Sequence, residues 1–155
     1  MIVAALAIAV APSPRAAPPP ERTLHMQRAA PAVWLDELPN GFLALPWGPP
    51  RPRLSHGRKP LTVAGQRFER GLGLRAPARL QIETAGRALR LRAWVGVDQE
   101  VSRGGSGPRP GSAVEFRVSA DGRERWRSGW MTDRSPARRV DVDLQAARRL
   151  VLEVL

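Results

Sequence analysis

The chain has 155 residues, contains no cysteine and carries a formal net charge of +11. Its length fits one compact domain, and a hydrophobic content of 43% is enough to bury a core. The absence of cysteine excludes a disulfide framework, a thiolate metal site and a cysteine nucleophile. The positive charge admits nucleic acid or another polyanion as a ligand, but 24 of the 25 basic residues are arginine, which indicates compositional bias as readily as a selected patch.

The first sixty residues differ from the rest, since they hold 12 of the 16 prolines. Proline lacks an amide donor and disfavours helix and central strand. Residues 2–10 form an apolar run that is too short for the ~20 residues of a transmembrane helix. Small residues and prolines follow the run, which predicts a signal peptide over residues 1–17 and hence export, although no basic residue precedes it. Residues 18–32 predict an extended Pro/Ala linker, so residues 33–155 form the expected folded domain.

The remainder of the chain alternates apolar and polar residues with the period of a β-strand. The alternating segments, in chain order, are residues 61–69, 80–83, 89–97, 114–118, 123–127, 140–144 and 150–154. Tight turns are expected at Ala64-Gly65 and Asp121-Gly122. Trp94 falls on the face opposite the apolar row of its strand. One-sided alternation of this kind predicts an all-β antiparallel sandwich or jelly roll, with most of the arginines on solvated faces.

The sequence gives little support for a catalytic function. His25 and His56 have no Asp or Cys at metal-ligand spacing, and Ser128 is not in a nucleophile elbow. Residues 71–76 resemble a dinucleotide loop, but Pro77 and the alternation beyond it predict a strand where that loop needs a helix. An enzyme is therefore the least supported class of function.

Four sequence blocks carry a more specific pattern. They are residues 60–78 (PLTVAGQRFERGLGLRAPA), 91–101 (LRAWVGVDQEV), 114–122 (VEFRVSADG) followed by Ser128-Gly129, and the pair 140–144 (VDVDL) and 149–154 (RLVLEV). In order and spacing they resemble the NPCBM domains, carbohydrate-binding modules found beside family 98 and other glycoside hydrolases and akin to family 51 carbohydrate-binding modules. The resemblance covers about Val33 to Leu155. It implies a galactose-binding-like β-sandwich that binds sugar without catalysis, as an appendage of a secreted enzyme, with a structural calcium ion near its loops.

The chain departs from the family pattern at four places. Arg75 replaces a histidine, Ala78 replaces a serine, and Gln99 replaces the second acid of an Asp-Asp-Glu block, which weakens the case for calcium. These changes alter the polar groups that would contact sugar hydroxyls. The chain ends at Leu155, where family members continue with an acidic loop and a Trp-bearing segment, so we expect a truncated domain that lacks its last strand.

Sugar sites combine a flat apolar face with a few polar side chains. The candidate carbohydrate-binding residues are Trp47, Arg75, Trp94, Trp130 and Arg134. Trp34 is expected to anchor the first strand instead. Asp98 and Glu100 lie two apart at a strand end and are candidate calcium ligands, although ordering the loop that follows them is the simpler role.

The prediction is a non-catalytic carbohydrate-binding module of a secreted or envelope protein. It binds galactose-type or acidic glycans at a loop-edge site and accompanies a hydrolase or envelope domain. One alternative keeps the sandwich but uses it to dock another protein or the envelope without binding sugar. A second alternative is polyanion binding through the arginine-rich faces, and nucleic acid is not favoured.

Overall fold

The structure is a computed structural model that describes residues 9–10, 32–38, 48–100 and 113–155. In chain order the described elements are β1 (Ala9–Val10), β2 (Val33–Trp34), the 3-10 turn η1 (Leu35–Glu37), β3 (Arg51–Pro52), β4 (Leu61–Val63), β5 (Gln66–Phe68), β6 (Leu72–Gly73), β7 (Ala78–Val95), β8 (Val114–Ala120), β9 (Arg123–Met131) and β10 (Arg138–Val154). The described residues include no helix with the length and apolar character of a membrane span.

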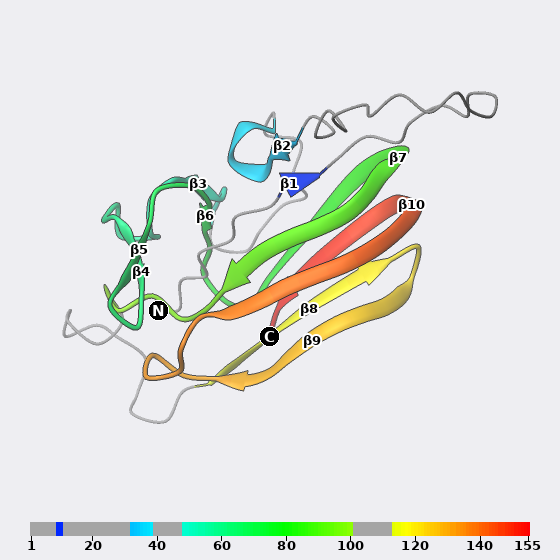
Figure 1. Cartoon of the computed structure of the whole chain (residues 1–155). Helices are drawn as coiled ribbons and strands as arrows, with labels where there is room; N and C mark the ends of the chain where they lie inside the picture. Colours follow the sequence, from blue (N-terminus) through cyan, green and yellow to red (C-terminus); the bar gives the residue numbers. More distant parts are fainter. Residues whose placement is uncertain (1–8, 11–31, 39–47, 101–112) are drawn as a thin grey trace, which may run out of the picture.

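The two longest strands, β7 and β10, double back at the same end of the molecule (Figure 1). Each turns on two consecutive residues with positive φ, Ala85-Gly86 in β7 and Gln145-Ala146 in β10. The turns touch each other, since a Cβ on Gly86 would lie 3.4 Å from the carbonyl oxygen of Ala146. Thr84 also donates its hydroxyl to the carbonyl oxygen of Ala147. The two strands therefore reverse together and remain paired on both sides of the reversal.

This reversal creates the two layers of the sandwich. Residues 90–95 of β7 pair with 138–143 of β10, and residues 78–83 pair with 149–154, all antiparallel. β1 extends the first layer, beyond which lies β2, whereas β8 and β9 extend the second. Both layers contribute to one hydrophobic core, in which Leu80 and Leu91 are fully buried. The predicted antiparallel β-sandwich is confirmed.

Two short antiparallel strand pairs, β3 with β6 and β4 with β5, cover the end of the sandwich opposite the reversals. β4 and β5 form the predicted hairpin, with positive φ at Ala64 and Gly65. Its buried Leu61 and Val63 form a small core of their own, against which Ala137 packs from the segment before β10. A Cβ on Gly96 would lie 2.3 Å from a methyl group of Val63, so the hairpin sits directly on the end of β7.

The inward and outward faces predicted for residues 91–95 are confirmed. Leu91, Ala93 and Val95 are buried, whereas Trp94 is exposed on the opposite face. The signal peptide predicted over residues 1–17 and the linker over 18–32 lie outside the described residues, apart from residues 9, 10 and 32. Within the predicted signal peptide, Ala9 and Val10 pair with both β2 and β7. The truncation after Leu155 stays a prediction.

Candidate functional site

One end of the sandwich gathers most of the candidate residues. Because β7 doubles back, the segment before it, which carries Arg75, and the segment after it, which carries Asp98 and Glu100, lie at the same end (Figure 1). β9 also ends there, with Trp130 as its penultimate residue, and the loop that carries Arg134 leads on to β10. We call this end, opposite the tight turns of β7 and β10, the loop end.

Asp98 ties the end of β7 to the β4–β5 hairpin. Its side chain is 1% exposed, and one carboxylate oxygen accepts the backbone N–H of Thr62 at 2.8 Å. The other accepts the N–H of Glu100 at 2.8 Å. Burial raises the pKa of Asp98, and these hydrogen bonds only partly oppose the rise. Each oxygen of the Asp98 carboxylate thus accepts a hydrogen bond from a backbone amide.

Glu100 holds the segment that precedes the hairpin. Its Oε2 accepts hydrogen bonds from the Ser55 hydroxyl and from the N–H of Gly57 at 3.1 Å. Lys59 Nζ lies 3.9 Å from the other oxygen. The fully buried Ser55 hydroxyl also accepts the N–H of Lys59 at 3.0 Å, which completes a small buried network.

These contacts give Asp98 and Glu100 a role that the sequence did not indicate, while the predicted ordering of the loop after them stays a prediction. Asp98 and Glu100 order residues 55–62, which lie earlier in the chain, and the loop that follows them falls outside the described residues. Three of the four carboxylate oxygens already accept hydrogen bonds, and a lysine ammonium faces the fourth. No group of three or more His, Cys, Asp or Glu suited to a metal ion occurs among the described residues. Because these oxygens already have protein partners, the structure gives no support to Asp98 and Glu100 as calcium ligands, and calcium binding by the domain stays a prediction.

Arg75 lies within a group of charges that the sequence did not reveal. Burial lowers the pKa of His56, and the positive charges of Arg51 and Arg75 lower it further. The negative charge of Glu100 opposes this shift. β3 and β6 create the group, because Arg51 pairs with Gly73, two residues before Arg75. Arg51, His56 and Arg75 therefore lie near one another at the loop end, together with the carboxylate of Glu100.

Trp130 is the most exposed large apolar side chain of the described residues, at 66%. Its neighbour Met131 is fully buried, so the end of β9 is fixed while the indole remains in solvent. The following loop is rigidly built: the N–H of Thr132 donates to the hydroxyl of Ser135 at 2.9 Å, and the N–H of Ser135 donates to the Thr132 carbonyl at 3.0 Å. The hydroxyl of Thr132 accepts the N–H of Arg134 at 3.3 Å. An aromatic face and an exposed guanidinium are thereby held close along the chain.

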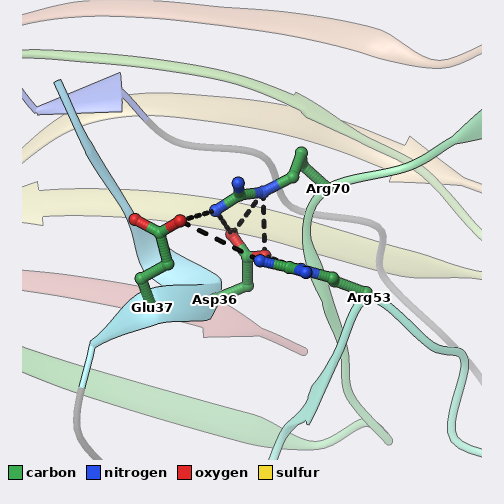
Figure 2. Close-up of polar contacts among 4 residues, drawn as sticks. All are labelled: Asp36, Glu37, Arg53 and Arg70. Atoms are coloured by element: carbon green, nitrogen blue, oxygen red, sulfur yellow. Dashed lines mark hydrogen bonds and ion pairs between the residues drawn. The ribbon is translucent and has the colours of Figure 1, made fainter.

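Trp34 has the structural role expected of it. The Arg70 guanidinium lies 4.8 Å from the centre of the Trp34 ring and also binds Glu37 at 2.5 Å. Asp36 accepts hydrogen bonds from Arg70 at 3.1 Å and from Arg53 at 2.8 Å. Figure 2 shows both arginines pointing at its carboxylate. Burial raises the pKa of the Asp36 carboxyl, but the hydrogen bonds from the two arginines outweigh it and hold the pKa below its usual value. This cluster fastens η1 to the segments around β3 and β6.

The family model described as NPCBM/NEW2 domain matches residues 32–155. The chain belongs to the NPCBM/NEW2 family. A comparison with curated protein sequences finds no match.

Solved structures agree with this assignment. The chain is similar to the CBM51 module of Clostridium perfringens GH95 in complex with methyl-galactose, at 23% identity and a TM-score of 0.66, over 79% of this chain and 85% of that one. It is similar to the structure of the M60 catalytic domain with the CBM51-1 and CBM51-2 domains of C. perfringens ZmpB, at 30% identity and 0.66, over 79% and 13%. For CBM51-2 in complex with GlcNAc and INT domains of ZmpB the values are 20% and 0.66, over 77% and 26%. The chain thus spans about a quarter or less of each ZmpB structure.

The NPCBM/NEW2 fold brings only some of the predicted site residues together. Arg75, Trp130 and Arg134 lie at the loop end. Trp94, the penultimate residue of β7, also lies near this end, but it is on the outer face of the first layer, 40% exposed and opposite Arg139 of β10. Trp47 lies outside the described residues. His56, which the sequence offered only as a poor metal ligand, joins the loop end beside Arg75.

Proposed function

We propose that this NPCBM/NEW2 module binds carbohydrate without catalysing a reaction, through a site at the loop end that includes Trp130, Arg134 and Arg75. The exposure of Trp130 carries the proposal. An indole that is 66% exposed beside a fully buried methionine contributes little to the core. A flat aromatic face of this kind stacks on the C–H face of a pyranose, and nearby polar side chains read the hydroxyl groups.

The positive charge of arginines at the loop end favours sugars that carry a carboxylate or sulfate as ligands, in addition to neutral sugars. Arg51 and Arg75 both lower the pKa of His56, and their nearby positive charges support a negatively charged ligand. Guanidinium groups match carboxylates with two parallel hydrogen bonds. Two similar modules were solved with methyl-galactose and with GlcNAc, which favours a ligand of one or two sugar units at this site.

The module is proposed to serve a neighbouring catalytic domain of an exported protein. The similar ZmpB structure contains an M60 catalytic domain together with two CBM51 domains. In such an arrangement the module holds the enzyme near its glycosylated substrate and leaves the chemistry to its neighbour.

Calorimetric titration tests the proposal. The folded protein should bind galactose, methyl-galactoside, GlcNAc or galacturonic acid with Kd between about 1 mM and 1 µM. Trp130→Ala should abolish measurable binding, whereas Trp130→Phe, which keeps a flat ring, should retain most of it. Arg149→Ala, at the opposite end of the sandwich, is the control that should bind normally. Absence of binding to the whole sugar panel by folded protein would overturn the proposal.

A further inference from the structure

The outer face of the first layer carries a second group of side chains that the loop-end site does not use. We call it the Arg–Trp face: Arg90, Arg92 and Trp94 of β7, and Arg139 and Asp141 of β10. The residues between them on both strands point into the core and are buried, which fixes these five on the opposite, solvent side.

The register places these side chains in direct cross-strand contact range. Trp94 is paired with Arg139, and Arg92 is paired with Asp141 on the adjacent rung. Directly opposed Cβ atoms in antiparallel strands lie ~5 Å apart. The indole of Trp94 is therefore bordered by Arg139 across the sheet and by Arg92 along its own strand.

One carboxylate serves three guanidinium groups on this face. Asp141 accepts hydrogen bonds from Arg90 and, at 2.8 Å, from Arg139, and Arg92 lies 3.8 Å from it. Each guanidinium has about five N–H donors, against about four acceptor positions on the carboxylate. The three arginine side chains remain 51%, 60% and 60% exposed. The face thus presents a surplus of positive charge and of hydrogen-bond donors.

Trp94 adds an apolar element to this charged surface. Its side chain is 40% exposed in the penultimate position of a strand whose inward residues already fill the core. An exposed indole bordered by donor-rich guanidinium groups combines the two chemistries that a charged sugar needs: a flat face for the ring and paired donors for its acid group.

We propose that the Arg–Trp face binds an acidic polysaccharide, with a sugar ring stacked on Trp94 and its carboxylate or sulfate held by Arg92 and Arg139. The flat surface of the two strands suits an extended chain, unlike the loop end, which suits one or two units. This proposal rests on the proposed function in taking carbohydrate as the ligand, but it concerns a separate site.

Asp141 favours a glycan over nucleic acid. It neutralises part of the charge of the three arginines on this face, which weakens attraction to a closely charged phosphate backbone more than attraction to a glycan with one charge per sugar. Asp143, the next outward residue on β10, adds a second negative charge and accepts the N–H of Gln145. A duplex carries about one negative charge per 1.7 Å and is bound best by unopposed basic stripes. Uronate and sulfate groups, spaced one sugar apart, can avoid both aspartates.

Affinity electrophoresis and titration with polygalacturonate, neutral galactan of similar length and duplex DNA, all at one ionic strength, test the proposal. Trp94→Ala and Arg92→Gln should each weaken polygalacturonate binding by about tenfold. Trp94→Phe should largely restore it. Arg149→Gln removes the same charge from an arginine that is 56% exposed near the opposite end, and it should change binding by less than about twofold. All four variants should melt like the wild-type protein.

Four results would overturn the proposal. The first three are equal losses for Arg92→Gln and Arg149→Gln, polygalacturonate binding that is unchanged in Trp94→Ala, and duplex DNA binding as tight as polygalacturonate binding. Loss of both monosaccharide and polygalacturonate binding in Trp130→Ala, with Trp94→Ala normal, would place both ligands at the loop end and also overturn it. Polygalacturonate binding that depends on Trp94, without any monosaccharide binding, would support the Arg–Trp face and reject the loop-end site alone.

Discussion

The side-chain hydroxyl of Ser55 donates a hydrogen bond to the carboxylate of Glu100, which lies 45 positions later in the chain. Both residues are buried, so this bond satisfies two polar groups that water cannot reach. It fixes the segment around His56, whose pKa the charges of Arg51 and Arg75 lower, against the end of β7. The geometry of the loop end therefore depends on a contact between two polar residues that lie in different parts of the sequence.

Ser55→Ala should lower the free energy of unfolding by about 2 kcal/mol, because it leaves a buried carboxylate and the N–H of Lys59 short of a partner. Urea denaturation measures the loss. Ser119→Ala, at a half-buried position on β8, should change stability by less than about 0.5 kcal/mol. Equal effects of the two variants would show that the Ser55–Glu100 bond contributes nothing.

Gly73→Ala should destabilise the protein by about 3 kcal/mol or more, because the new Cβ would lie 2.1 Å from the carbonyl oxygen of Leu54. The clash is with backbone and cannot be relieved by a side-chain rotation. Gly65→Ala is the matched control: its Cβ meets nothing within 4 Å, and its positive φ alone should cost about 1 kcal/mol. Melting temperatures of the two variants, compared with the wild type, measure the difference. Equal decreases would contradict the close approach of β6 to the segment after β3.

Asp36→Asn should cost about 2 kcal/mol at neutral pH, and this difference should shrink on acidification. The pKa of Asp36 is lowered in the folded protein, so the unfolded chain takes up the proton first as the pH falls. The stabilisation by Arg53 and Arg70 is therefore complete above the ordinary value of 3.8 and is lost as the pH falls through the lower, folded value. Urea midpoints of both proteins measured across that acidic range test the sign. A difference that grows on acidification would contradict the ion-pair assignment.

Arg75→His restores the residue of the family pattern and should shift ligand preference toward neutral sugars. At about pH 8 a histidine is uncharged, so galacturonic acid should bind roughly tenfold more weakly while galactose changes little. Arg79→His, at an arginine that is 59% exposed and paired with Glu153 at the start of β7, is the matched control. If both variants lower galacturonic acid binding equally, the effect is one of overall charge and Arg75 does not contact the ligand.

Local sequence patterns determined much of this protein. The alternation over residues 89–97 assigned Trp94 to the outside and Leu91 to the core, and the Ala64-Gly65 and Asp121-Gly122 turns lie where the pattern placed them. Such features follow from side chains that alternate with period two and from residues that tolerate positive φ. The same local blocks carried the resemblance to the NPCBM family, which the family match over residues 32–155 confirms.

The tertiary structure decided which of these elements meet. Residues 80–83 and 89–97 were expected as separate strands, and nothing in their alternation indicated that β7 and β10 would reverse together and pass from one layer to the other. That reversal brings the segments that carry Arg75, Trp130 and Arg134 to one end, where Glu100 also binds Ser55, whereas Trp94 faces outward from the first layer. Alternation reports which side of a strand is buried, whereas the choice of partner depends on contacts between residues far apart in the chain, which no local pattern encodes.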